Sequence, residues 1–415
     1  MGGAVVPHPA LGPKNPAYEA YPPRYGYNPG IQVPVGLLGL LVPSRNPLLY
    51  KNNRDDFRTN FDFLTFYDQV SHPSSFLLNP AVSPEKVVLS VEEGSVRIED
   101  GNGNPLLFRD SIGTRGMSVG GTPLIPPPLV ALPLRIDNLY FRTGVFTGGG
   151  GYRFFPDSDL SSALETTEFS PLTEYSIRGG GSLQSGISQS LTFAAPVHER
   201  ENSRTFFGAR LLLFYMAGYI DGDIFINMAT DARAVPVFAG MEWNYFYLYP
   251  GRGGGYGMRF DSGVVFERGP LTLGIGALNL LGFVKLNGYE SDFNTYGTEE
   301  EIPASRSFSR FLPGVFSNAA YALHSRFGEL VLAGDIGYVT GWVFHTGILI
   351  LGKRTFFRTG VGWDGSSRFG TSIGTRMKNR WAEIAVTNHE APLVGGRVYG
   401  IAVHTGRYSP GQKIR

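Results

Sequence analysis

Residues 257–268 read GMRFDSGVVFER, a segment in which apolar side chains alternate with small or charged ones. Successive side chains of a β-strand point to opposite faces, so an extended chain would sort these residues into two sets. One face would carry Met258, Phe260, Ser262, Val264 and Phe266, and the other Arg259, Asp261, Gly263, Val265 and Glu267. The segment therefore predicts a strand with one apolar face and one face that is small or charged.

The same alternation recurs at 329–339, 355–364, 381–388 and 396–407. These segments run for about ten residues, which suits a tilted strand that crosses a bilayer, whereas soluble strands have a mode of about five or six. A soluble antiparallel sandwich also alternates, but it needs no aromatic residues at its strand ends. The aromatic residues that we expect at the two membrane interfaces are Tyr245, Phe246, Tyr247, Tyr249, Trp342, Trp363, Trp381 and Tyr408.

Composition narrows the class of protein further. The 415 residues include 56 glycines, about twice the ordinary share, and 17% charged residues against a typical ~25%. The 36 basic and 35 acidic residues leave a charge of +1, so no overall field would attract nucleic acid. There is no cysteine, which excludes a disulfide framework, a thiolate zinc site and a cysteine nucleophile. The longest apolar run, 31–43, is interrupted by prolines and glycines and is too short for a membrane helix of about 20 residues.

These patterns predict an all-β fold, a transmembrane antiparallel β-barrel of about fourteen strands. An even number closes a bacterial barrel, and closure leaves no unpaired edge in lipid. The expected strands are 30–43, 137–148, 181–195, 205–217, 234–248, 256–268, 270–282, 313–325, 328–340, 342–352, 354–364, 367–377, 381–389 and 397–407. The count changes by two if 205–230 holds two strands around Asp221-Gly222.

The connections between these strands predict an orientation. Those at 269, 326–327, 352–353 and 378–380 are very short, and short connections of such barrels lie on the periplasmic side. The connection 283–312 is long, is acidic at 299–301 and would lie on the opposite side.

The chain divides into five expected regions. Residues 1–29 are rich in proline, tyrosine and glycine; 30–43 form the first strand; 44–136 form a folded insert or lumen plug; 137–408 form the rest of the barrel; and 409–415 are a tail. The insert contains a hairpin-like passage at 86–99, followed after the turn 100–103 by 105–109, and a proline-rich stretch at 123–128. The start of the chain lacks the pattern of a signal peptide, so we expect the leader of an exported protein to be missing from it.

Several short phrases resemble the FadL-type outer-membrane barrels, a superfamily of long-chain fatty acid transporters with toluene-channel, TraF-like and PorV-like relatives. They are Lys14-Asn15-Pro16-Ala17 before GIQVPVGLLG at 30–39, GALNLLG at 276–282, Leu312-Pro313 with AAYAL at 319–323, RTGVGW at 358–363, and 369–376. The resemblance implies that residues 1–29 form an N-terminal plug containing Asn15, Pro16 and Ala17. It also implies that hydrophobic compounds enter from extracellular loops and leave sideways into the membrane. Asn15, Pro16 and Ala17 could equally form a plain turn.

Ionisable residues on the non-apolar faces are the expected lining of the lumen. They are Arg259, Asp261, Glu267, Asp335, His345, Arg358, Asp364, Arg376, Glu383 and His404. Facing lipid near the midplane, an unpaired charge would cost about 2–4 kcal/mol, so we expect these side chains to face inward. They could form ion pairs that fill a wet lumen and hold the plug, or they could line a selective path. His345 and His404 could also titrate there.

No constellation in the sequence indicates an enzyme, a metal or a cofactor. GTSIG at 370–374 matches a hydrolase motif that needs a strand–turn–helix context, but it lies within an alternating strand. The glycine runs at 148–151, 179–181 and 253–255 lack the context of a phosphate loop. The seven histidines show no metal-binding spacing.

Three functions remain open from the sequence. The first is a channel for hydrophobic small molecules such as long-chain fatty acids in a bacterial outer membrane, with outer-membrane lipid and an apolar ligand as partners. The second is a structural or secretion-partner barrel of the PorV or TraF kind that binds another protein through its loops. The third is a soluble β-rich surface or carbohydrate-binding protein.

Overall fold

The computed structural model describes the barrel wall, part of the insert and one N-terminal segment. The described residues are 15–20, 31–33, 35–41, 69, 75–79, 88–92, 95–99, 111–112, 118–119, 122–123, 130–166, 168–294, 299–308, 313–326, 328–338, 342–363, 367–377, 380–390 and 397–407. No helix in this part of the chain is long and apolar enough to cross a membrane.

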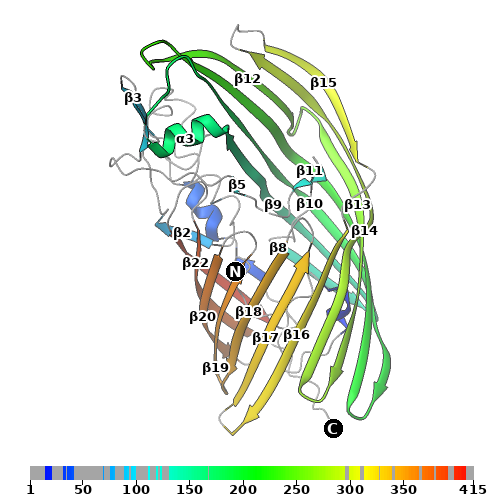
Figure 1. Ribbon diagram of the computed structural model, residues 1–415. Helices are drawn as coiled ribbons and strands as arrows, with labels where there is room; N and C mark the ends of the chain where they lie inside the picture. Colours follow the sequence, from blue (N-terminus) through cyan, green and yellow to red (C-terminus); the bar gives the residue numbers. More distant parts are fainter. Residues whose placement is uncertain are drawn as a thin grey trace.

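One antiparallel sheet curls into a barrel (Figure 1). Its long wall strands are, in order, β8 (Val130–Ile136), β9 (Leu139–Pro156), β10 (Glu174–Arg200), β11 (Ser203–Thr230), β13 (Gly254–Arg268), β14 (Leu271–Asn294), β16 (Gly314–Ser325), β17 (Gly328–Tyr338), β18 (Trp342–Leu351), β19 (Thr355–Trp363), β20 (Ser367–Met377), β21 (Arg380–Glu390) and β22 (Arg397–Arg407). Each pairs with the next in an antiparallel register.

A short strand completes the circle. β1 (Ile31–Val33) pairs with the lower part of β22 and also lies beside β8. With β1, the described wall has fourteen strand positions, and β2, β5, β12 and β15 bring the sheet to eighteen strands. The expected all-β barrel is confirmed. β2 (Ser75–Asn79) pairs with β22 beyond β1 and continues its line upward.

The wall is much taller on one side than on the other. β11 pairs with β13 as far as Met216, and from Tyr219 onward with β12 (Pro236–Leu248). The upper part of β14 likewise pairs with β12 and with β15 (Glu299–Phe308). We call β12, β15 and the upper parts of β9, β10, β11 and β14 the extension; it rises above the rest of the barrel in Figure 1.

The identities of the strands differ from the expected ones in four places. Segment 234–248 corresponds to β12, which belongs to the extension and not to the wall. In its place, β8 is one of the fourteen strands of the wall. The strand expected at 30–43 ends at Val33, because Pro34 lacks the N–H that a central strand needs, and the 3-10 helix η3 (Val35–Leu41) follows. The connection expected at 283–312 contains the end of β14 and all of β15. Segment 205–230 is one strand that includes Asp221-Gly222.

The insert and the loop between β9 and β10 hold the remaining elements. β3 (Val88–Glu92) and β4 (Ser95–Glu99) form a hairpin within the expected passage 86–99, whereas 105–109 lies outside the described residues. β6 (Ser118–Val119) pairs with β7 (Thr122–Pro123), and β5 (Ser111–Ile112) pairs with β9. Helix α3 (Ser158–Thr166) starts after Asp157, whose carboxylate accepts the Leu160 N–H at 2.7 Å as an N-cap.

Candidate functional site in the barrel interior

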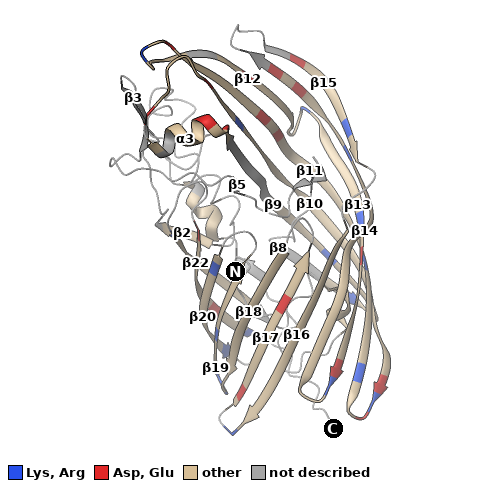
Figure 2. Ribbon diagram, viewed as in Figure 1, with Lys and Arg blue, Asp and Glu red and all other residues tan. Residues whose placement is uncertain are grey.

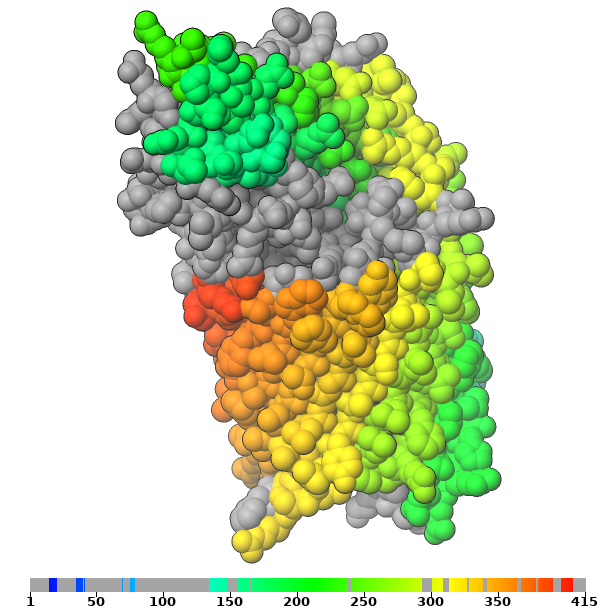
Figure 3. All heavy atoms as spheres, viewed as in Figure 1, coloured from blue at the N-terminus to red at the C-terminus, as the bar shows by residue number. Residues whose placement is uncertain are grey.

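The two faces of the wall differ as the alternation predicts. Large apolar residues exposed on the outer face include Leu273, Ile275, Val315, Tyr321, Leu332, Ile336, Ile348, Ile350, Phe357, Val361, Phe369, Ile373, Ile384 and Val386. Figure 3 shows this side of β16–β20 as a continuous surface, and Figure 2 shows few charged positions across it, with charges more frequent in the extension and near strand ends. An exposed apolar belt of this extent is typical of a surface that faces lipid.

An N-terminal 3-10 helix is fixed to the inner face of the wall. In η2 (Pro16–Glu19), the preceding Asn15 caps the helix, because its Oδ1 accepts the Ala17 N–H at 3.0 Å. Its Nδ2 donates to the carbonyls of Val264 on β13 at 3.1 Å and of Ile275 on β14 at 3.4 Å. Asn15 and Ala17 are completely buried, so this short helix is tied to two neighbouring wall strands at once.

Other residues of η2 reach further around the wall. Glu19 forms an ion pair with Arg142 of β9 at 2.7 Å, and the Tyr18 hydroxyl bonds with Asn318 of β16. Two glycines make room for the helix: a Cβ at Gly208 would lie 2.3 Å from the backbone of Pro16 and Ala17, and one at Gly263 would lie 2.3 Å from Asn15 Oδ1. The wall is therefore shaped to receive this segment.

A buried charge cluster lies next to the η2 contacts. Asp261 of β13 accepts hydrogen bonds from Arg210 of β11 at 2.7 and 3.0 Å, and Arg259 lies 3.5 Å away. The other oxygen of Asp261 accepts the N–H of Asn279 at 3.0 Å, where β14 bulges away from the β13 register and Asn279 has a φ of 56°. The Asp261 carboxylate thus balances the charge of the two guanidinium groups and also accepts a backbone N–H of the bulge.

A second cluster crosses four neighbouring strands. Glu383 of β21 lies 3.4 Å from Arg358 of β19 and 3.8 Å from His404 of β22, and Ser372 of β20 donates to its Oε1. All four side chains are buried. Burial of this kind is tolerated where opposite charges and hydrogen bonds compensate one another.

In addition to these two clusters, one pair of ionisable residues joins β17 and β18. Asp335 and His345 lie directly opposite each other in the register of these strands. His345 Nδ1 and Asp335 Oδ1 are 2.6 Å apart. Among the other expected lumen residues, Glu267 is buried six residues beyond Asp261, and Arg376 is partly buried four residues beyond Ser372. Asp364 lies outside the described residues.

Sequence reasoning missed several residues of these clusters, above all Arg210. The alternation of β11 would have placed Arg210 on the same face as Phe206 and Gly208. Its link to Asp261, 51 residues away, depends on which strands become neighbours. The described residues contain no group of three His, Asp or Glu side chains that could hold a metal ion.

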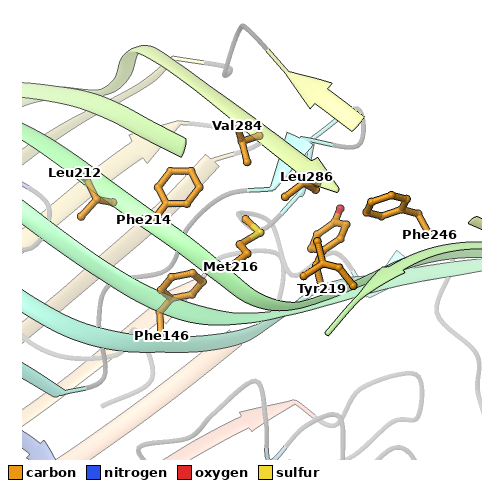
Figure 4. Close-up of a cluster of buried hydrophobic side chains, with 9 residues drawn as sticks. Phe146, Leu212, Phe214, Met216, Tyr219, Phe246, Val284 and Leu286 are labelled. Atoms are coloured by element: carbon orange, nitrogen blue, oxygen red, sulfur yellow. The ribbon is translucent and has the colours of Figure 1, made fainter. Parts of the chain in front are cut away.

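An apolar cluster covers the inner face where the barrel meets the extension (Figure 4). Its buried members are Phe146, Leu212, Phe214, Met216, Tyr219, Phe246, Leu248, Val284 and Leu286, from β9, β11, β12 and β14. The inward-facing residues of β11 therefore change character along the strand. Phe206 and Gly208 contact η2, Arg210 belongs to the charge cluster around Asp261, and the residues from Leu212 to Tyr219 contribute to the apolar cluster. An apolar region with a few polar groups at one end is the usual character of a site for a hydrophobic ligand.

The expected aromatic girdle is correct only in part. Trp342 of β18 is exposed near the upper end of the belt, and Trp363 of β19 stacks on the exposed Phe344. Trp381 and Phe246 are buried on the inner face, which contradicts the expectation. Tyr245 and Tyr247 belong to β12 of the extension, Tyr249 follows the end of that strand, and Tyr408 lies outside the described residues.

The fold and the interior define an antiparallel β-barrel with an apolar outer belt, a charged inner face and an N-terminal segment inside, the architecture of membrane-spanning barrels. No family model and no curated protein matches the chain. Among solved structures, it is similar to the toluene transporter TbuX of Ralstonia pickettii, with 10% identity and a TM-score of 0.36 over 67% of this chain and 80% of that chain. It is also similar to a structure described as "Asymmetric conductivity of engineered proteins", with 10% identity and a TM-score of 0.22 over 58% of this chain and 100% of that one. Such TM-scores do not establish a shared topology, so the functional argument rests on strand pairing, burial and contacts.

Proposed function

We propose that the protein is an outer-membrane channel for hydrophobic small molecules such as long-chain fatty acids. Support for the location comes from the apolar belt and from wall strands joined by very short connections at the end opposite the extension. Barrels of bacterial outer membranes have their short turns in the periplasm, which would place the extension outside the cell.

The observation that carries the proposal is the apolar cluster on the inner face. A barrel that only crossed the membrane would have no need for a cluster of nine large or medium apolar side chains on its inner face, since its inner face can be polar. These side chains would offer an apolar compound a site that it cannot find in water. The adjacent Arg210–Asp261–Arg259 cluster would meet the polar end of an amphipathic ligand.

We propose further that the Asn15-Pro16-Ala17 segment is the gate of this channel. Its contacts to β9, β11, β13, β14 and β16 would keep it in the lumen, and their loss would open the path. Release would follow sideways into the membrane, as the sequence resemblance implies.

Ligand binding tests the proposal directly. The protein, purified from membranes, is titrated by native mass spectrometry with two probes, oleate and toluene, and its co-purified lipids are extracted. We expect a near-stoichiometric apolar ligand with the native chain and its loss with Leu286→Gln. Leu349→Gln is the matched control, because Leu349 is equally buried but lies on β18, on another part of the wall. Equal binding by both variants, or a ligand-free protein that carries a partner chain, would contradict the proposal.

A further inference from the structure

The short connections at the end of the barrel opposite the extension differ in charge from one side of the wall to the other (Figure 1). Those that join β16 to β17, β18 to β19 and β20 to β21 are flanked by exposed or half-buried cations. We call these cations the basic rim; they are Arg326, Lys353, Arg354, Arg376 and Arg380. Across 324–329, 351–355 and 376–381 the sequence has one acidic residue. It is Glu329, whose Oε1 lies 3.4 Å from the Nδ1 of His324.

The register of the strands places cations of the basic rim beside one another. The Arg376 N–H donates to the carbonyl of Arg354 at 2.7 Å, so these two residues are opposite each other where β19 meets β20. On the next pair of strands, Arg380 of β21 is opposite Arg407 of β22. Adjacent strands are about 4.8 Å apart, and like charges directly opposite one another destabilise a sheet. The basic rim thus concentrates positive charge that the single carboxylate of these connections cannot balance.

The other half of the same barrel end is neutral. Arg204 of β11 is opposite Glu199 of β10 and also opposite Glu267 of β13. The connections 198–204 and 267–269 together contain three arginines and three glutamates, namely Arg200, Arg204, Arg268, Glu199, Glu201 and Glu267. Short connections of this wall can therefore be compensated in charge, and the excess of cations is specific to the side formed by β16–β21.

The basic rim continues the apolar belt of the outer face. Along β21, Arg380 lies on the same face as the exposed Ile384. Four residues at about 3.3 Å each give about 13 Å along the strand, or about 9 Å of height at a tilt of 45°. Met377 of β20, which is opposite Arg380, is 54% exposed. Extending the β19–β20 register by two residues puts Lys353 on the other side of Met377. The last apolar side chain of the belt is thus flanked by two cations, at the boundary between hydrocarbon and headgroups.

From this arrangement we infer that the basic rim binds anionic phospholipids of the leaflet at the short connections. In the proposed orientation this is the periplasmic leaflet of the outer membrane. The acyl chains would lie on the apolar belt, and the phosphate would accept hydrogen bonds from Lys353 and Arg380 beside Met377. Bound phosphates would also offset the repulsion among the cations of the rim. A soluble acidic protein would match the charge but not the adjoining apolar surface, so the continuity of the two favours a lipid.

The test is native mass spectrometry of the full chain in a nonionic detergent, with phosphatidylglycerol and phosphatidylethanolamine of identical acyl chains added in equal amounts. We expect preferential retention of phosphatidylglycerol, because the ammonium group of phosphatidylethanolamine neutralises its own phosphate. Lys353→Gln/Arg380→Gln should lower the affinity for phosphatidylglycerol tenfold or more, since each cation near an anionic membrane surface contributes about fivefold.

Arg200→Gln/Arg268→Gln is the matched control. It removes the same charge from two exposed arginines at the same end of the barrel, on the neutral half, and should retain the native affinity. Equal retention of the two lipids by the native chain, or equal losses in the two variants, would overturn the inference. Displacement of the lipid by glycerol phosphate, which has the headgroup without the acyl chains, would also overturn it.

A second measurement locates the lipid on the native rim. A variant with Met377→Trp as its only tryptophan is reconstituted in vesicles that contain a minor fraction of either brominated phosphatidylglycerol or brominated phosphatidylethanolamine. We expect stronger quenching by the brominated phosphatidylglycerol. A variant that keeps only Trp342, near the other end of the belt, should be quenched equally by both lipids. Equal quenching of the Met377→Trp variant by both would contradict the inference. Neither measurement depends on whether the barrel transports a ligand.

Discussion

Single glycines decide whether the N-terminal helix can lie against the wall. At Gly208, a Cβ would meet the backbone of Pro16 and Ala17 at 2.3 Å, where no side chain can move aside. We predict that Gly208→Ala displaces η2 while the barrel still folds. Hydrogen exchange of residues 15–20 should accelerate at least tenfold, because the N–H groups of Ala17, Tyr18 and Ala20 depend on this local structure.

Gly337→Ala is the control for this prediction. Its Cβ would make ordinary contacts at 3.4 Å and 3.5 Å with β16, so exchange at residues 15–20 should stay as in the native chain. If Gly208→Ala left this exchange unchanged as well, the tight fit of η2 on β11 would be refuted.

Asp261 is the carboxylate on which the first charge cluster depends. Asp261→Asn would leave Arg210 and Arg259 without their shared counter-charge and weaken the acceptor for Asn279. Breaking a buried ion pair from one side costs about 3–5 kcal/mol, so we predict a lower midpoint of unfolding in urea. The double variant Arg210→Gln/Asp261→Asn should recover part of the loss, since two neutral amides leave fewer uncompensated charges. Additive losses would show that the two residues are not coupled.

At the scale of elements, alternation predicted the strands of the wall well and those of the extension only in part. β13, β16 and β19–β22 repeat apolar outward residues and were found near their observed bounds. β15, with Glu299, Glu300 and Glu301 in succession, does not alternate in this way, and it is held by its pairing with the upper part of β14. β12 does alternate, and no local feature of its sequence indicates that it belongs to the extension and not to the wall.

β11 connects the two environments within one strand, which permits an internal comparison. Both halves pair on both edges, with β10 throughout and with β13 or β12 on the other side. If residues 203–216 lie in the membrane and 219–230 above it, the backbone of the lower half has far less access to water. We predict slower hydrogen exchange in nanodiscs for the lower half. Faster exchange there would contradict the position assigned to the membrane.

The hairpin between β11 and β12 should depend on pH through Asp231. The N–H groups of Val235 and Arg233 donate to its carboxylate at 3.0 and 2.7 Å and hold the pKa of Asp231 below its usual range. A depressed pKa stabilises the turn above the ordinary pKa of an aspartate, and this effect is lost as the pH falls through the depressed value. We predict that Asp231→Asn speeds local exchange at neutral pH and has no effect once the native carboxylate is protonated. An equal effect at both pH values would contradict this role.

At the scale of the whole molecule, the closure of the wall decides which residues meet. The sequence indicated that Asp261 and Glu383 would avoid lipid, but their partners Arg210, Arg358 and His404 became neighbours only through strand order and register. The apolar cluster of Figure 4 joins four strands, and no local pattern shows that Phe146 and Leu286 share one level. The fold was therefore more predictable than the site.

The most direct test of the membrane-spanning barrel compares two tryptophans that differ in the face they occupy. Trp342 is 57% exposed on the outer face and Trp381 is 2% exposed on the inner face. Variants that keep only one of them are reconstituted in vesicles of brominated phosphatidylcholine. The barrel described here predicts strong quenching of Trp342 and little quenching of Trp381. Equal quenching of the two, or a native chain that stays soluble without detergent, would contradict it.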